Sequence, residues 1–386
     1  MTGPSASNSS DPSRTAESLP PLPPVLAQAL PTFTVPEPQD APPLRWGIIG
    51  AGHIAGTFAS DVPAYSSGRV VAVGARDRGR AEVFAAAHPQ PDGVAAPDGG
   101  VPAAVGSYED LVSRDDVDAV YVATPHAFHA EHALTALEAG KPVLVEKAFT
   151  RNRTEAESVL AEARSRHLFA MEAMWSRFLP SQLLTRAVAE TGLIGDVVSV
   201  RADHFQPIKQ VARLASPELA GGALLDLGVY PVSLIHSILG APRAVDAVGH
   251  LTGLGVDMAE AVVMGYPDAV AVASSGMNAT SAVTAEVTGT VGRVELATRF
   301  YAPTHVGVTL TDTDADRDPK GRPSHRVHEW DGRVPGGFQY QAAEVARCLA
   351  AGAIESEVLP WQDTLEVMAV LDRVRAAIGV VYPGER

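Results

Sequence analysis

The chain has 386 residues and a formal net charge of −15. It is too long for one hydrophobic core of ordinary size, so we expect two domains. The acidic charge argues against nucleic acids and anionic membrane surfaces as partners, because both are themselves negative. Cys348 is the only cysteine, which excludes an intrachain disulfide and a cysteine metal cluster and favours the reducing cytoplasm.

Residues 1–43 differ in composition from the rest of the chain. They contain eleven of its 30 prolines together with many serines and threonines. Such a segment buries too little apolar surface to offset the entropy lost on ordering, which predicts a disordered tail over 1–43. A docking segment for a partner is the alternative. The proline-broken stretch 19–30 is not typical of a signal peptide, and we find no apolar run approaching the roughly 20 residues of a membrane helix.

From residue 44 onward, short apolar strands alternate with helices. Continuous apolar strands of this kind indicate a parallel sheet covered on both faces, and short right-handed crossovers make it doubly wound. We therefore predict an α/β Rossmann domain over residues 44–168. The expected strands are 45–50, 70–75, 119–123 and 142–146, and the expected helices are 54–61, 80–87, 108–111 and 129–139.

The segment 169–386 has a different rhythm. Its strand-like stretches follow one another closely, with Gly, Asn and Asp at the turns, which predicts a second α/β domain with a largely antiparallel sheet. The expected strands are 197–205, 244–251, 259–266, 270–275 and 283–294, and the expected helices are 223–239, 338–351 and 362–378.

The first strand runs into a glycine turn, GAGHIA, at residues 50–55. In such a turn Gly50 permits the sharp bend, Gly52 lets a pyrophosphate approach the backbone, and the small Ala55 allows close packing of helix and strand. The phosphates then meet the positive end of a helix that begins near His53 and Ile54. The position of the turn after the first strand predicts a dinucleotide site, and a purely structural turn is the alternative.

The end of the second strand indicates which cofactor is used. An acidic residue at this point binds the ribose hydroxyls of NAD, whereas an arginine accommodates the 2′-phosphate of NADP. This chain has Arg76 there and Arg80 one helical turn later. We therefore predict NADP, with NAD kept open by Asp77 and a solvated charge run as the alternative reading.

An ordered set of motifs resembles the Gfo/Idh/MocA family of oxidoreductases. The set consists of GAGHIA (50–55), ATP (123–125) with His129 after it, AGKPVLVEK (139–147) and GGALLDLGVY (221–230). The segments MEAMWSRFLP (171–180) and GVVYPGE (379–385) resemble the branch that includes dimeric trans-dihydrodiol dehydrogenase and NADP-dependent D-xylose dehydrogenase. One departure is Ala148, where the family usually has proline.

The resemblance implies a Rossmann domain followed by an α/β domain whose open, largely antiparallel sheet often serves as a dimer face. It also implies a homo-oligomer, and cofactor contacts by further residues. With the glycine turn and the two arginines, we expect these contacts at Thr124, Pro125, His129, Glu146, Lys147, Trp175 and Arg177. His126, His129 and His132 also suggest a metal, but no carboxylate stands at matching spacing, so we predict none.

Lys147, Asp226 and Tyr230 are the predicted catalytic residues. Lys147 follows the last expected strand of the first domain, where ligands bind in open α/β sheets. Asp226 and Tyr230 are four residues apart and should share a helix face. We expect Lys147 to lower the pKa of Tyr230, which would make the phenol a general acid/base. Lys147 would then contact the substrate oxygen and the nicotinamide ribose, and Asp226 would bind a substrate hydroxyl and orient Lys147.

The leading hypothesis is an NADP-dependent dehydrogenase acting on a polyhydroxylated ring, either an aldose or a trans-dihydrodiol. A cofactor-sensing regulatory protein without turnover is the alternative from another class. A third is an aldose–aldose oxidoreductase whose cofactor never leaves. The loops 206–220 and 312–322 are expected to determine the substrate.

Overall fold

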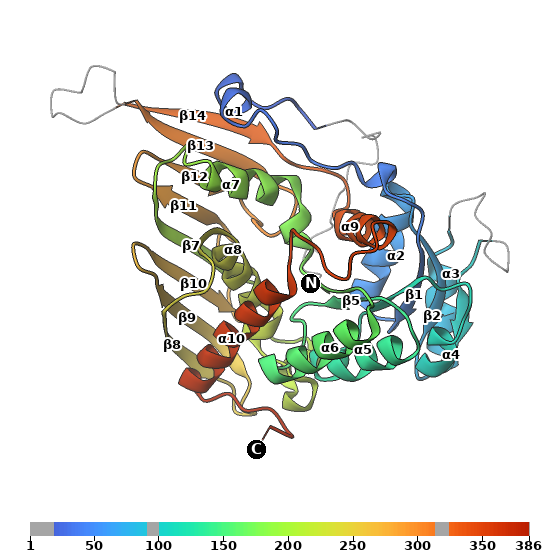
Figure 1. Ribbon diagram of the computed structural model, residues 1–386. Helices are drawn as coiled ribbons and strands as arrows, with labels where there is room; N and C mark the ends of the chain where they lie inside the picture. The colour runs from blue at the N-terminus through green and yellow to red at the C-terminus, as the bar shows by residue number, and fades with distance from the viewer. Residues whose placement is uncertain (1–18, 91–99, 313–323, 386) are drawn as a thin grey trace, which may run out of the picture.

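The computed structural model describes residues 19–90, 100–312 and 324–385, which form two sheets with helices packed between and around them (Figure 1). The smaller sheet has six strands, all parallel, in the order β3-β2-β1-β4-β5-β6. This is the strand order of the dinucleotide-binding doubly wound fold. The strands are β1 (Arg45–Ile49), β2 (Arg69–Gly74), β3 (Ala103–Val105), β4 (Ala119–Val122), β5 (Val143–Glu146) and β6 (Ala170–Ala173).

Helices cover both faces of this parallel sheet, which explains why its central strands are continuously apolar. Every residue of β4 and β5 is buried. The helices are α2 (His53–Tyr65), α3 (Arg78–Ala87), α4 (Tyr108–Val112), α5 (His129–Glu138) and α6 (Arg153–Arg166). The predicted doubly wound domain is confirmed. Its last strand, β6, lies beyond residue 168, so the expected domain boundary was placed too early.

The larger sheet has eight strands in the order β14-β13-β12-β11-β7-β10-β9-β8. All neighbouring pairs are antiparallel except β10 and β7, which run parallel. The strands are β7 (Val197–Phe205), β8 (Ala244–Leu251), β9 (Asp257–Gly265), β10 (Val270–Gly276), β11 (Ala285–Gly289), β12 (Gly292–Leu296), β13 (His305–Asp312) and β14 (Ser324–Asp331). The predicted antiparallel character is confirmed, although β13 and β14 were not expected.

Helices lie on only one face of the larger sheet (Figure 1). They are α7 (Pro180–Glu190), α8 (Val229–Leu239) and α10 (Trp361–Ile378), while α9 (Phe338–Ala350) packs back against α2 of the Rossmann domain. Along β10 the residues alternate between buried and exposed positions, as expected for a strand covered on one side. The other face, with Val263 and Val272, is therefore open to solvent.

The expectation of a disordered tail over residues 1–43 is wrong for 19–43, while residues 1–18 lie outside the described part. Residues 19–43 include the short helix α1 (Pro24–Ala29), in which Leu26 is fully buried. The indole nitrogen of Trp330 donates to the carbonyl oxygen of Pro20 at 2.9 Å. Prolines restrict the unfolded chain and so lower the entropy cost of ordering, which composition alone does not reveal.

The stretch Pro217–Leu239 is long and apolar enough to cross a membrane by length and composition. We expected no apolar run of this length from the sequence, because Glu218, Asp226 and His236 interrupt the stretch. In the structure, 83% of its most apolar window is buried inside the protein. This burial is typical of a core helix, and α8 accordingly packs against β7 and β10 of the larger sheet and against α10.

Candidate active site

The carboxyl ends of β1, β2, β4 and β5 open onto a single cleft of about 620 Å³. Its walls come from both domains, because Arg213 and Asp226 of the second domain complete it. This is the edge at which parallel α/β sheets bind their ligands. The lining residues include most of those predicted from the sequence, namely Gly50, Gly52, His53, Ile54, Arg76, Arg80, Thr124, Pro125, His129, Glu146, Lys147 and Asp226.

The glycine turn has the geometry that a pyrophosphate requires. Gly50 has φ +105, and a Cβ at this position would lie only 2.7 Å from the carbonyl oxygen of Ala123. A Cβ on Gly52 would instead point into empty space, so the backbone is open to an approaching ligand. Gly52 caps α2 without any side-chain hydrogen bond, which leaves the first N–H groups of that helix free for phosphate oxygens. Ala55 is buried behind the turn, as expected.

Two arginines lie beside the place where the adenosine ribose of a dinucleotide would sit. Arg76 and Arg80 both line the cleft, and Arg76 also lies over the ring of Phe128. The carboxylate of Asp77 accepts the N–H of Gly79 at 2.9 Å and so caps α3. Asp77 also lines the cleft, but one of its oxygens is engaged in this cap, whereas neither arginine forms an ion pair with an acid among the described residues.

His129 connects the two loops that flank the cleft. Its Nε2 lies 2.7 Å from the carbonyl oxygen of Thr124, and its Nδ1 lies 2.9 Å from that of Ala148. Burial lowers the pKa of His129 to about 4, so the neutral ring donates to one of these carbonyls at a time. His129 therefore supports the cofactor loop and the backbone beyond Lys147. No group of three potential ligands is placed to hold a metal ion within 19–90, 100–312 and 324–385.

Lys147 and Asp226 meet at the inner end of the cleft. The Lys147 Nζ donates to the backbone carbonyl of Asp226 at 3.0 Å and lies 3.5 Å from its carboxylate Oδ1. Arg213 donates to the same Oδ1 at 2.9 Å. Burial opposes ionisation of Asp226, but the two cations outweigh it and hold its pKa well below the usual range. Asp226 is therefore an anion shared by two cations.

Glu146 lies next to Lys147 at the end of β5 and is almost fully buried. Its carboxylate accepts the hydroxyl of Tyr121 and the backbone N–H of Lys147. Burial raises the pKa of Glu146, although the Lys147 charge opposes that shift. Glu146 thus borders the cleft while it orients the backbone from which the Lys147 side chain extends.

Tyr230 lies behind Lys147, at the start of α8. The Lys147 Nζ is 5.0 Å from the centre of the phenol ring. Asp226 belongs to a π-helical turn (Leu224–Gly228), which directly precedes α8. Such wide turns recur at functional sites. Lys147 therefore contacts both Asp226 and Tyr230, the two other predicted catalytic residues.

The expectation that Lys147 lowers the pKa of Tyr230 is wrong in this structure. The pKa of Tyr230 is raised well above its ordinary value, chiefly by burial and then by the negative charge of Glu146. The indole N–H of Trp175 donates to the Tyr230 oxygen at 3.0 Å. That bond occupies a lone pair and leaves the phenolic hydrogen free to donate elsewhere. The Tyr230 phenol is therefore neutral near pH 7.

Aromatic side chains from distant parts of the chain surround Tyr230. His204 of β7 stacks on Tyr301 with ring centres 4.3 Å apart, and Tyr301 lies 4.7 Å from Tyr230. Trp175 stacks on Phe338 at the start of α9. Trp175 thus contacts the tyrosine and not the lining of the cofactor cleft. Burial lowers the pKa of His204 to about 4, so this aromatic wall carries no charge near pH 7.

The structure places Arg177 away from the cleft, against the expectation of a cofactor contact. Its guanidinium is buried and donates to Ser233 of α8 at 2.9 Å and to Asp363 of α10 at 3.1 Å. A buried arginine needs such partners, and these lie on helices that the sequence could not show to be adjacent. Arg177 therefore joins three segments of the second domain.

Sequence reasoning did not identify Arg213, His204 or Tyr301. Arg213 lies in the loop 206–220 that was expected to shape the substrate pocket, so its presence near Asp226 supports that part of the expectation. The other expected loop, 312–322, lies outside the described residues from 313 onward. His204 and Tyr301 had no detectable signal, because each looks like an ordinary strand or turn residue.

Comparison with known proteins covers both domains. Residues 44–174 match the model described as the Oxidoreductase family, NAD-binding Rossmann fold, and 183–295 match the GFO/IDH/MocA C-terminal domain. The bovine (Bos taurus) trans-1,2-dihydrobenzene-1,2-diol dehydrogenase is 36% identical over 348 residues, which cover 89% of this chain and 99% of that protein. The human (Homo sapiens) enzyme of the same name is 34% identical over the same share of each chain.

Solved structures give the same result. KijD10, a 3-ketoreductase from Actinomadura kijaniata in complex with NADP and TDP-benzene, superimposes with a TM-score of 0.72 at 29% identity. The match covers 87% of this chain and 98% of that one. The expected family resemblance is confirmed. The chain belongs to the Gfo/Idh/MocA family of oxidoreductases and carries that family's NAD(P)-binding Rossmann domain.

Proposed function

We propose that this protein is an NADP-dependent dehydrogenase that interconverts a hydroxyl and a carbonyl group on a polyhydroxylated ring. The observation that carries the proposal is the contact of Lys147 with both Asp226 and Tyr230 at the inner end of the cofactor cleft. A cation, an anion and a phenol are together there. These are the groups needed to bind a hydroxyl, to move its proton and to stabilise charge on its oxygen.

Each residue has a separate role in the proposal. Bound nicotinamide supplies the carbon that accepts or gives up the hydride. The Lys147 ammonium binds the reacting oxygen and stabilises negative charge on it. The Tyr230 hydroxyl, held by Trp175 Nε1, donates the proton when a carbonyl is reduced, and its phenolate takes the proton back when a hydroxyl is oxidised. Asp226 accepts a hydrogen bond from a neighbouring hydroxyl and holds Lys147 in place.

The aromatic wall supports a ring-shaped substrate. Trp175, His204 and Tyr301 surround Tyr230 with uncharged rings, and of these three Tyr301 is partly exposed. Such surfaces pack well against the C–H face of a sugar or against an unsaturated ring. The curated relatives are named for a trans-dihydrodiol, and the ketoreductase structure contains a nucleotide linked to benzene. We therefore infer a trans-dihydrodiol or a cyclic aldose as the substrate class.

The test is direct. Purified protein is mixed with NADP or NAD and with a panel of trans-dihydrodiols, aldoses and acyclic polyols, and the absorbance of reduced nicotinamide is followed. We expect turnover with cyclic substrates and NADP. Cofactor binding without turnover across the whole panel would contradict the proposal and favour a sensing role. Cofactor already present in the purified protein would favour a closed cycle between two sugars.

Cofactor preference provides a second prediction. Replacing either Arg76 or Arg80 with glutamine is expected to raise KM for NADP about 10- to 100-fold, because one charge-assisted hydrogen bond contributes about 1.5–3 kcal/mol. KM for NAD should stay within about twofold, since NAD has no 2′-phosphate. Arg78→Gln is the matched control: Arg78 is exposed in the same helix and pairs with Glu82. Equal changes in both KM values would argue against 2′-phosphate binding.

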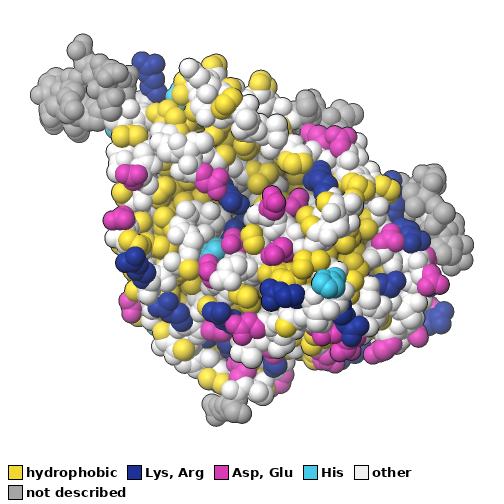
Figure 2. Space-filling view, viewed as in Figure 1, with side chains coloured by type: hydrophobic (Ala, Val, Ile, Leu, Met, Phe, Trp, Pro, Cys, Tyr) yellow, Lys and Arg dark blue, Asp and Glu magenta, His cyan; other side chains and the backbone are white. Residues whose placement is uncertain are grey.

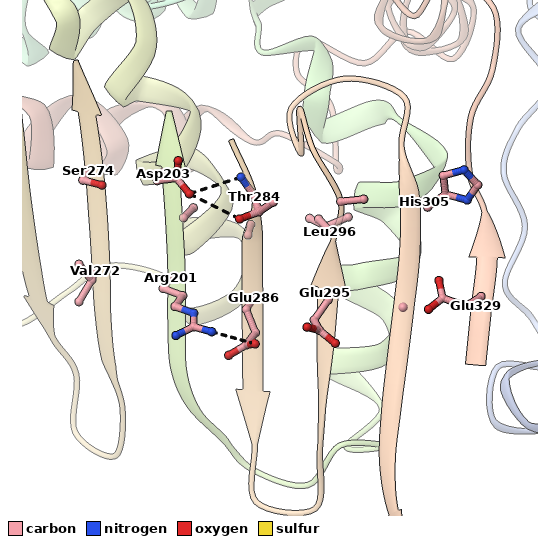
Figure 3. A pocket seen from close by; sticks show the side chains of 14 residues that line it. Arg201, Asp203, Val272, Ser274, Thr284, Glu286, Glu295, Leu296, His305 and Glu329 are labelled. Atoms are coloured by element: carbon pink, nitrogen blue, oxygen red, sulfur yellow. Dashed lines mark hydrogen bonds and ion pairs between the residues drawn. The ribbon is translucent and has the colours of Figure 1, made fainter. Parts of the chain in front are cut away.

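We also propose that two copies associate through the open face of the larger sheet. Figure 3 shows this face, where Arg201, Glu286 and Glu295 form one row across neighbouring strands. Exposed Val263 and Val272 continue the row on β9 and β10. Mixed apolar and charged surface of this kind suits a self-complementary dimer interface. Sedimentation tests it, because the dimer has twice the 40.3 kDa of one chain.

We also propose that the protein works in the cytoplasm, from its surface charges and from Cys348. Acidic and basic side chains are interspersed on the face in Figure 2. Cys348 is partly buried, and burial together with Glu344 raises the pKa of its thiol to about 12. A thiol of this kind stays reduced and unreactive, which suits an enzyme of the cytoplasm.

A further inference from the structure

Two buried carboxyl groups lie behind the turn that carries Asp226. Asp257 begins β9 and is fully buried, and Glu260, three residues later, is 4% exposed. Neither lines the cofactor cleft. Asp257 Oδ1 and Glu260 Oε2 find no conventional hydrogen-bond donor among the described residues. A buried polar atom without a partner destabilises the folded state, so these two oxygens need an explanation.

A proton between the two groups satisfies both oxygens. The two carboxyl groups are close enough to interact electrostatically, and burial raises the pKa of each. Two ionised carboxylates side by side in a dry interior would repel strongly, whereas one acid and one carboxylate form a short, charge-assisted bond. The buried pair therefore carries a single negative charge.

The negative charge of the Asp257–Glu260 pair faces the start of the π-helical turn Leu224–Gly228, which carries Asp226. Asp257 Oδ2 accepts the backbone N–H of Leu224 at 2.5 Å. Gly222 has φ +116, and the Asp257 carboxylate occupies the space that a Cβ at Gly222 would need. Gly222 thus allows close packing against this carboxylate, while Gly221 allows close packing against the backbone of Arg213 and Leu214. Asp257 fixes the place at which the turn begins.

The other member of the pair meets the end of the same turn. Ser275 of β10 donates its hydroxyl hydrogen to Glu260. A Cβ on Gly228 would lie 2.6 Å from the Ser275 Oγ and 3.0 Å from Glu260 Oε1, so only glycine fits this close. Asp226 lies between the two contact points, and Tyr230 follows two residues after the second.

We propose that Asp257 and Glu260 share one proton and act as positioning residues that set the places of Asp226 and Tyr230 relative to Lys147. This inference rests on the proposed function, because the pair acts through the proposed catalytic groups. It assigns the pair a role in kcat and none in cofactor binding. A displacement of about 1 Å at reacting groups is enough to lower a rate about 100-fold.

Two substitutions of Glu260 test whether the turn is positioned by the hydrogen shared with Asp257 or only by the volume of the side chain. In Glu260→Gln the amide N–H replaces the shared proton and the amide oxygen still accepts from Ser275, so kcat should stay within about threefold of the parent. In Glu260→Ala both contacts are lost, and kcat should fall about 100-fold with KM for NADP unchanged. If Glu260→Ala does not fold, Gly228→Ala is measured in its place. Its added methyl group displaces the turn from the opposite side, so kcat should fall by a similar factor.

A readout independent of activity is hydrogen exchange of residues 221–230. The amides there should exchange about 10-fold faster in Glu260→Ala than in the parent, and at the parent rate in Glu260→Gln. The matched control is Glu344→Ala, which removes a partly buried carboxylate on α9 that accepts from Ser356 and contacts neither Asp257 nor the turn. We expect this control to leave both kcat and the exchange of 221–230 unchanged.

The outcomes are distinct. Parent-like exchange and kcat in Glu260→Ala would overturn the positioning role, and a glutamine variant as impaired as the alanine variant would overturn the shared proton. If the parent turns over no substrate in the panel, the proposed function fails. The exchange measurement then still decides whether the pair holds the turn.

Discussion

Replacing Tyr230 with phenylalanine is expected to lower kcat by about 100- to 10,000-fold, the range over which a positioned acid or base contributes to a rate. The substitution removes one oxygen atom and keeps the ring that stacks beside Lys147 and Tyr301. The dissociation constant for NADP should remain within about twofold, because Tyr230 does not line the cofactor cleft. Steady-state kinetics and a cofactor titration measure the two quantities separately.

The control for this variant is Tyr266→Phe. Tyr266 is a half-buried tyrosine whose hydroxyl donates to the carbonyl of Gly240, far from Lys147. It should lose a little stability and keep the parent kcat. Full activity in the Tyr230 variant would show that another group transfers the proton.

The raised pKa of Tyr230 also determines how the rate depends on pH. The protonated phenol is the form that donates, so carbonyl reduction should be constant near neutrality and decline only when the pH rises past that raised pKa. Hydroxyl oxidation needs the phenolate and should therefore increase steadily from neutral to strongly alkaline pH. In Tyr230→Phe the residual oxidation rate should lose this increase. Rates measured in both directions over the same pH series test the sign.

Replacing Lys147 with methionine is expected to reduce kcat by about 100- to 1,000-fold, as when one preorganised donor to a developing oxyanion is removed. Among the described residues, the variant leaves Asp226 with Arg213 as its one ion-pair partner. Methionine has a similar length, so packing against the Tyr230 ring is largely kept. The effect should appear in kcat for every substrate that turns over.

A second lysine at the other end of β5 is the control. Lys141 donates to the backbone carbonyls of Arg114 and Val117, at the edge of the sheet opposite the cleft. Lys141→Met should destabilise the fold modestly and leave kcat unchanged. If both lysine variants lost activity to the same extent, the loss at Lys147 would reflect folding and not chemistry.

The sequence was sufficient for the fold class and the family because both depend on local patterns. The alternation of apolar strands and helices and the GAGHIA turn are each written within a few consecutive residues. Lys147, Asp226 and Tyr230 could be named for the same reason, since each lies in a contiguous motif. Their meeting at one point follows from the fold, where the end of β5 faces the turn before α8.

What the sequence could not supply are properties produced by long-range packing. The pKa of Tyr230 depends on Trp175, His204 and Tyr301, which are far apart in the chain and bury the phenol only after folding. Arg177 follows Trp175 by two residues, yet its guanidinium pairs with Asp363 on another helix. A residue's neighbours along the chain therefore say little about the environment of a buried side chain.

The N-terminal segment 19–43 precedes the family's Rossmann domain, which begins at residue 44. Three of its contacts use its own backbone carbonyls: Pro20 accepts from Trp330, Glu37 from Arg347 and Gln39 from Ser67. Any residue provides such a carbonyl, so the exposed positions of the segment can change and keep these bonds, whereas the buried Leu26 and Leu30 cannot. Divergence among close relatives should therefore be fast at these exposed positions and slow at Trp330, Arg347 and Ser67, the side chains that hold the segment.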